Sequence, residues 1–205
     1  TKLHEMVMAC PVPRAVEIAI TARAENLETG GLGLAVRSSA FGEGGERSFA
    51  GQFLSLLNVP PDQVVDAYKR VVAGRFSERA FFYRLSTGMM EVETPMAVLF
   101  LPMIRARAAG IMYTRDPNNP GSKVIWVTAT RGLGLEIASG RMPADLFVIS
   151  RGRQHEILER TVVRKDNILA LADGGGLRRQ ALDPEEADAE SLDAAQLKIL
   201  AAWGV

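Results

Sequence analysis

The chain has 205 residues, of which 47% are hydrophobic and 23% charged, as in an ordinary globular domain or a pair of small lobes. Its 24 basic and 24 acidic residues give no net charge, so bulk charge does not indicate nucleic acid or an anionic membrane as a partner. The single cysteine, Cys10, excludes an internal disulfide and fits a reducing compartment. No apolar run is long enough to span a bilayer, and we expect a cytoplasmic protein.

The first part of the chain predicts helices and two short strands. A helix is predicted over residues 12–28, where apolar residues precede a glycine pair that ends the segment. Apolar, strand-like runs follow at residues 34–37 and 53–58. Residues 60–62 then open an amphipathic helix, because apolar side chains recur behind them at helical spacing.

One more helix is predicted before the chain changes character. Ser77 is a suitable N-cap for a helix that runs through Leu85. Phe81, Phe82 and Tyr83 lie within it, and we expect all three in the core because aromatic side chains are usually buried.

From Pro95 onward the sequence favours strands. The apolar runs 96–104 and 109–113 flank a short basic stretch, and we expect them to pair as a hairpin. Turn residues are dense at 116–122, and a glycine run at 172–176 predicts a flexible loop. Further strands are predicted over residues 124–129, 146–149 and 157–163.

A helix is predicted at the end of the chain. Asp193 suits its N-cap, with Gln196 in the capping-box position, Leu192 and Leu197 as a hydrophobic staple and Gly204 as the stop. The order of elements is therefore α+β, not alternating β-α-β. The glycine patterns of a Rossmann fold and of a P-loop are both absent from the sequence.

The stretch most indicative of chemistry is residues 35–40, AVRSSA, which delivers Arg37 and two hydroxyls into a loop rich in glycine and charge at 41–47. A guanidinium, hydroxyl groups and free backbone N–H groups are what a polyphosphate requires. Glycine allows the backbone to approach such a ligand closely. The alternative is a solvated hairpin with one exposed arginine.

Taken together, several blocks resemble the nucleotide-binding region of the phosphoenolpyruvate synthase and pyruvate phosphate dikinase family. They agree with that family in order and in approximate spacing over roughly residues 34–165. The blocks are VRSSA at 36–40, SFAGQ at 48–52 with LNV at 57–59, AGIMYTRDP at 109–117, GLGLE at 132–136 and, more weakly, PADLFV at 143–148.

The resemblance implies an ATP-grasp fold in which two α+β lobes, residues 1–95 and 96–205, hold ATP. Arg37 would contact the nucleotide phosphates and act in catalysis, and Leu101 stands where many family members carry a glutamine. Glu136 would lie at the edge of the cleft, although a carboxylate at a helix start is an alternative reading of it. The implied nucleotide-binding residues are Arg37, Ser38, Ser39, Gly51, Gln52, Ser55, Leu101, Met103, Ile104 and Glu136.

Asp116 and Asp145 are assigned no such role. We expect Asp116 to be a turn residue ahead of proline, and Asp145 to be a turn or cap residue.

The family's reaction converts ATP, pyruvate and water into AMP, phosphoenolpyruvate and phosphate. Its β-phosphoryl group travels on a histidine of a separate domain, and a further domain binds pyruvate; neither histidine of this chain has the required context. The carboxylate ligands of Mg²⁺ are expected outside this chain, so that no metal site is assigned to it. We therefore expect most of the ATP-binding domain of a larger phosphotransferase, inactive by itself.

Two alternatives remain open at this stage. One is a regulatory nucleotide-binding module without catalysis on the same fold, and the other is a dikinase that acts on a glucan or an antibiotic. Expected partners are ATP and the other domains of the parent protein, with neither nucleic acid nor membrane, and self-association is left open.

Overall fold

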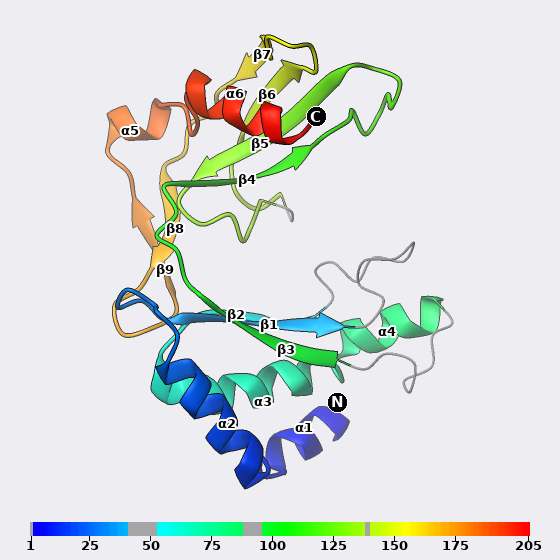
Figure 1. Cartoon of the computed structure of the whole chain (residues 1–205), viewed down its shortest axis with the longest axis vertical. Coiled ribbons are helices and arrows are strands. Elements are labelled where there is room, and N and C mark those ends of the chain that lie inside the picture. The colour runs from blue at the N-terminus through cyan, green and yellow to red at the C-terminus, as the bar shows by residue number, and fades with distance from the viewer. Residues whose placement is uncertain (1, 41–52, 88–95, 138–139) are drawn as a thin grey trace. The chain divides into compact units, whose positions relative to one another are not determined.

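The computed structural model describes residues 2–40, 53–87, 96–137 and 140–205. It divides into two compact units (Figure 1). Unit 1 comprises residues 1–104 and 171–177, and unit 2 comprises residues 105–170 and 178–205. Both units combine helices with antiparallel strands, so the predicted α+β class is confirmed. Within the described residues, no helix has the length and apolarity needed to cross a membrane.

Unit 1 is a three-stranded sheet with helices on one side, in the order β2-β1-β3 (Figure 1). Both pairings are antiparallel. Its elements are α1 (Lys2–Ala9), α2 (Arg14–Glu25), β1 (Leu34–Ala40), β2 (Ser55–Val59), the 3-10 turn η1 (Pro61–Gln63), α3 (Val64–Gly74), α4 (Glu78–Thr87) and β3 (Met96–Pro102).

Alternation along β1 decides which face of this sheet is covered. Leu34 and Val36 are fully buried and pack with Val64 and Val71 of α3. Because successive strand residues point to opposite faces, Arg37 lies on the face away from this core. Its exposed side chain confirms that orientation.

Unit 2 contains a four-stranded antiparallel sheet in the order β4-β5-β6-β7. Helix α6 packs on one face, where Leu197 and Ala201 are fully buried against Ile125, Phe147 and Ile149. The elements are β4 (Ala108–Tyr113), β5 (Val124–Arg131), β6 (Asp145–Ser150), β7 (Ile157–Thr161), α5 (Pro184–Asp188) and α6 (Ala194–Trp203).

Strands β8 (Asn167–Leu171) and β9 (Leu177–Ala181) form a separate two-stranded sheet. Residues 171–177, the turn of this hairpin and the strand ends beside it, belong to unit 1, while the rest of both strands belongs to unit 2. The glycine run predicted as a flexible loop therefore makes this turn, with positive φ at Gly174, Gly175 and Gly176.

The hairpin predicted between residues 96–104 and 109–113 is wrong. β3 pairs with β1 along seven residues, from Leu34 opposite Pro102 to Ala40 opposite Met96. β4 pairs with β5 instead. The basic stretch between the runs is thus a passage from unit 1 to unit 2, and β3, which we assigned to the second lobe, lies in unit 1.

The aromatic residues of α4 also differ from expectation. The predicted cap is confirmed, since the Ser77 hydroxyl accepts from the Ala80 N–H at 3.2 Å. However, Phe81 is 49% exposed and Phe82 is 70% exposed. Tyr83 is half-buried. Among the α4 side chains that the structure describes, Ala80 is the one that is fully buried, so two of the three aromatic residues predicted in the core lie at the surface.

Helix α6 begins with the predicted capping box. The Asp193 carboxylate accepts from the Gln196 N–H at 2.8 Å, and the Gln196 side chain accepts from the Asp193 N–H at 2.9 Å. We expect Asp193→Ala to lower the free energy of unfolding by about 1 kcal/mol, because one helix N–H loses its partner. Urea unfolding measures this change. Gln196→Ala is the control and loses less, since Asp193 still caps; equal losses would contradict the assignment.

Candidate functional site

Arg37 lies in the middle of β1, on the open face of the unit 1 sheet. Its Cα is paired with Ser55 on β2 and with Leu99 on β3. Directly paired residues of antiparallel strands share a face, so a hydroxyl and an apolar side chain flank the guanidinium. Leu99 is 46% exposed and Leu101, two residues further along β3, is 39% exposed. One face therefore presents a cation beside apolar surface.

The other predicted phosphate-site residues are distributed unevenly. Ser39 is exposed and lies two residues after Arg37, so it shares the open face. Ser38 lies between them and points to the opposite face, where it is half-buried. Gly51 and Gln52 lie outside the described residues, as does most of the glycine-rich loop.

Residues 101–104 continue β3 to the end of unit 1. Leu101 is paired with Ala35 on β1. The Met103 N–H donates to the Gly33 carbonyl at 3.1 Å, so this N–H already has a partner. Ile104 is 75% exposed. The segment thus combines a fixed backbone with exposed apolar side chains.

Glu136 lies in a turn of unit 2, where the Arg179 guanidinium of β9 donates to its carboxylate. The carboxylate is neutralised by an ion pair that joins residues 43 positions apart in the sequence. The Glu136 carboxylate therefore already has a cationic partner in this arrangement.

The strongest electrostatic feature of unit 2 is a buried ion pair that sequence reasoning missed. The Lys165 Nζ donates to Asp145 Oδ1 at 2.6 Å, and both side chains are completely buried. Lys165 also donates to the Val163 carbonyl at 2.7 Å. The Asp145 carboxylate accepts from the Val163 N–H at 3.0 Å and from the N–H and hydroxyl of Ser191, each at 2.7 Å.

These bonds satisfy Asp145 on every side. Burial alone raises the pKa of this carboxyl, but the bonds from Lys165, Ser191 and Val163 favour its charged form and hold the pKa below its ordinary value of 3.8. Asp145 opens β6 and, through Ser191, fixes the segment that leads into α6. It is therefore a structural residue, and the expectation of a simple turn or cap understated its role.

Asp116 behaves as predicted. Its carboxylate accepts from the Asn118 N–H at 2.8 Å and from the Ser122 hydroxyl at 3.4 Å. These contacts close the turn between β4 and β5. Asp116 is therefore a turn-forming residue.

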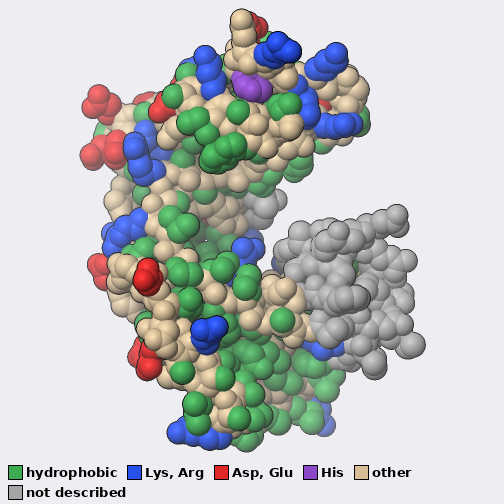
Figure 2. Space-filling view, in the orientation of Figure 1, with side chains coloured by type: hydrophobic (Ala, Val, Ile, Leu, Met, Phe, Trp, Pro, Cys, Tyr) green, Lys and Arg blue, Asp and Glu red, His purple; other side chains and the backbone are tan. Residues whose placement is uncertain are grey.

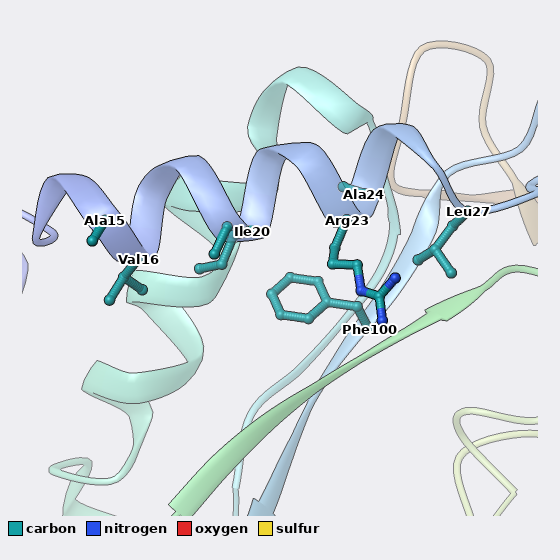
Figure 3. A pocket seen from close by; sticks show the side chains of 8 residues that line it. Ala15, Val16, Ile20, Arg23, Ala24, Leu27 and Phe100 are labelled. Atoms are coloured by element: carbon teal, nitrogen blue, oxygen red, sulfur yellow. The ribbon is translucent and has the colours of Figure 1, made fainter.

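A separate pocket lies on the helix side of unit 1, between α2 and Phe100 of β3 (Figure 3). Figure 3 shows the apolar side chains of α2 facing Phe100, with Arg23 as the charged group among them. The volume of this pocket is about 380 Å³. Apolar side chains are also abundant on the surface around these helices in Figure 2. Arg37 points to the other face of the sheet, so this pocket is distinct from the surface around Arg37.

The described residues do not by themselves make a magnesium site. No group of three or more His, Cys, Asp or Glu side chains in the described ranges is placed to hold a metal ion. Of the three acids considered above, Asp145 is paired with Lys165 and Glu136 with Arg179. The third, Asp116, accepts two hydrogen bonds within its turn. Carboxylate ligands free to coordinate are what Mg²⁺ requires.

The open face of the unit 1 sheet, with an arginine beside exposed apolar side chains, suits a ligand that is both anionic and apolar, as a nucleotide is. Residues 1–205 match the family model described as "Pyruvate phosphate dikinase, AMP/ATP-binding domain". The chain belongs to this family, which confirms the resemblance found in the sequence.

Curated relatives carry several names. The chain is 36% identical over 158 residues to a "Probable phosphoenolpyruvate synthase" of Staphylothermus marinus, covering 73% of this chain and 19% of that protein. It is 30% identical over 207 residues to a "Rifampicin phosphotransferase" of Bacillus subtilis, covering 99% and 23%. It is 31% identical over 201 residues to a "Prodigiosin synthesizing transferase PigC" of Serratia marcescens, covering 97% and 22%. The chain thus spans about a fifth of the length of these relatives.

Proposed function

We propose that this chain is the ATP-binding domain of a larger phosphotransferase of the phosphoenolpyruvate synthase type, and that it has an ATP-grasp fold. The parent protein would convert ATP, pyruvate and water into AMP, phosphoenolpyruvate and phosphate through a phosphohistidine. The histidine-bearing and pyruvate-binding domains would lie elsewhere in that protein. The observation that carries the proposal is the exposed Arg37 beside Leu99 and Leu101 on one sheet face.

Each part of the nucleotide has a counterpart on this face. The Arg37 guanidinium can donate two parallel hydrogen bonds to phosphate oxygens, and the hydroxyls of Ser39 and Ser55 can add further ones. Apolar side chains such as Leu101 offer surface to the adenine ring. Since the Met103 N–H is engaged by Gly33, the base would pair with neighbouring backbone groups, for example at Ile104.

Catalysis in phosphoryl transfer rests mainly on positioning and on electrostatic stabilisation. Arg37 would supply both in this chain, because a guanidinium fixed by a strand stabilises the negative charge that develops on the phosphate oxygens. Glu136 would stay at the rim of the site, paired with Arg179. The Mg²⁺ that accompanies ATP would be held by carboxylates elsewhere in the parent protein.

A different phosphoryl acceptor is the second candidate. Rifampicin phosphotransferase of Bacillus subtilis matches almost the whole chain, whereas the match to the Staphylothermus enzyme covers 73% of it. Acceptor choice would be decided by other domains, so an assay of the full-length protein with pyruvate and with rifampicin separates these candidates. Failure with every acceptor, together with retained ATP binding, would favour a regulatory module instead.

We expect Arg37→Ala to weaken ATP binding at least tenfold, about 1.4 kcal/mol, because a charge-assisted contact to the phosphates is lost. Isothermal calorimetry with ATP and Mg²⁺ measures this change. Arg14→Ala is the matched control: it removes the same charge from unit 1, where Arg14 is exposed and paired with Glu17, and leaves affinity unchanged. Equal affinities for the Arg37 variant and the wild type would overturn the assignment of Arg37.

A further inference from the structure

The chain passes between its two units at three places. These passages fall between residues 104 and 105, between 170 and 171, and between 177 and 178. The first follows β3, and the other two lie in the β8–β9 hairpin. Any change in the arrangement of the units must therefore be accommodated at or near these three positions.

Asn58 lies at the end of β2, in the unit 1 core, and is 5% exposed. Its side chain uses all its principal hydrogen-bonding groups: Oδ1 accepts from the Gly33 N–H at 3.1 Å, and Nδ2 donates to the carbonyls of Ala172 and Gly176, both at 2.8 Å. The Asn58 carbonyl also accepts from the Gly176 N–H at 2.9 Å. Four hydrogen bonds therefore converge on one buried residue.

Its backbone is in the left-handed region, with φ of 56°. Asparagine enters this region more readily than most residues, because its short polar side chain can bond locally. Both the conformation and the amide chemistry thus favour asparagine here. Aspartate would tolerate the same φ but lacks the two N–H donors.

Gly33 extends this contact to the first passage, which follows β3. Its carbonyl accepts from the Met103 N–H at 3.1 Å, while its own N–H donates to Asn58. A Cβ at Gly33 would lie 2.6 Å from the Asn58 carbonyl carbon and 2.8 Å from Oδ1. Only glycine allows the two segments to approach this closely.

The residues joined in this way lie next to the passages. Met103 immediately precedes Ile104, the last residue of unit 1 before the first passage. Ala172 follows Leu171, where the chain re-enters unit 1, and Gly176 precedes Leu177, where it leaves again. All of these contacts are within unit 1, so they fix the unit 1 side of every passage.

We infer that Asn58 is a positioning residue that anchors all three connections between the units and, through Gly33, fixes the backbone of the base-binding segment at Met103 and Ile104. The second role rests on the proposed function. It follows that any change in the arrangement of the units would be accommodated beyond these anchors, while the segment proposed to meet the adenine stays in place.

The test uses Asn58→Asp, which keeps size and tolerated φ but removes both donors. The matched control is Asn26→Asp, since Asn26 donates to the Ala22 carbonyl at an exposed helix end of the same unit. We expect amide hydrogen exchange at Ala172 and Gly176 to rise at least tenfold in Asn58→Asp and to stay unchanged in the control, whereas the Gly33 N–H keeps its acceptor because a carboxylate oxygen replaces Oδ1. Unchanged exchange at these amides, or an equal rise in exchange throughout α3, would overturn the anchoring role of Asn58.

Gly175→Ala covers the case in which Asn58→Asp does not fold. A Cβ there would lie 2.8 Å from the Pro60 ring and 3.2 Å from the Asn58 carbonyl oxygen, so it displaces the hairpin turn while Asn58 stays intact. We expect faster exchange at Gly176 with α3 amides unchanged. Slow exchange at Gly176 in this variant would contradict the inference.

A nucleotide readout separates positioning from simple destabilisation. We expect Asn58→Gly, which tolerates the positive φ but also removes the acceptor of the Gly33 N–H, to weaken ATP binding at least threefold but to leave binding of inorganic tripolyphosphate unchanged, because Arg37 is untouched. Equal loss for both ligands, or no loss for either, would overturn the positioning role. If the wild-type chain bound neither ligand, the proposed function and this role would fail together, and the exchange measurement would still decide the anchor.

Discussion

Replacing Asp145 with alanine is expected to lower the free energy of unfolding by about 3–5 kcal/mol, enough to unfold unit 2 under mild conditions. The reason is that the Lys165 ammonium stays fully buried and loses its only carboxylate partner among the described residues. In addition, the N–H groups of Val163 and Ser191 lose their acceptor. Urea unfolding followed by circular dichroism measures the change.

Two further variants distinguish this pair from an ordinary ion pair. Asp166→Ala removes a carboxylate from an exposed pair with Arg164 and should cost less than about 1 kcal/mol. The double variant Asp145→Leu with Lys165→Met removes both buried charges and should recover much of the lost stability. A double variant as unstable as Asp145→Ala would show that the charge pairing is not the cause.

The same pair gives a pH dependence whose sign can be derived. The pKa of Asp145 is lower in the folded chain than its ordinary value of 3.8, so the folded state favours the charged carboxylate. Its contribution is complete above the ordinary pKa and is lost as the pH falls through the lower, folded pKa. Unfolding curves at pH 7, 4.5 and 3 should therefore show a loss below about pH 4 that is smaller in Asp145→Asn.

Gly110→Ala is expected to cost about 3 kcal/mol, because it forces the edge strand β4 away from β5. A Cβ at Gly110 would lie 2.2 Å from the Thr128 carbonyl oxygen and 3.1 Å from the Ala129 Cα. Both neighbours are backbone atoms of β5, which is itself paired with β6. Neither atom can therefore move without disturbing that pairing. Thermal unfolding of the variant measures the effect.

The control for this variant is Gly121→Ala, in the turn between the same two strands. There a Cβ would meet only the Asn119 side chain, at 3.6 Å, which is ordinary contact. We expect a change within about 0.5 kcal/mol, since a substitution that fits also restricts the unfolded chain. If Gly110→Ala changed the free energy of unfolding as little as Gly121→Ala does, the close approach of β4 to β5 at Gly110 would be contradicted.

Local sequence signals predicted several elements well. The apolar spacing of α3 and the capping box at Asp193 can both be read from the sequence, because the residues that specify them lie within one to three helical turns. The strand that carries Arg37 was also predicted from its immediate neighbours, and Arg37 lies within β1. The residues that specify each of these features lie close enough in the sequence for a local pattern to include them.

Longer-range features could not be predicted in this way. The partner of β3 is β1, about sixty residues earlier, rather than the apolar run that follows it. Lys165 lies 20 residues from Asp145, and Asn58 lies 114 residues from Ala172. No local rule connects such residues, so the buried ion pair and the hairpin anchor became visible only in three dimensions. The exposed Phe82 shows that a hydrophobic type does not determine burial.

The central claim is that ATP binds the open face of the β2-β1-β3 sheet, and methyl NMR during an ATP titration tests it most directly. We predict saturable shifts of the Leu99, Leu101 and Ile104 methyl groups, with Leu34 on the covered face as the internal reference. Saturable shifts confined to Ile20 and Leu27, which line the α2 pocket, would contradict the claim. So would the absence of any saturable shift at millimolar ATP in the folded chain.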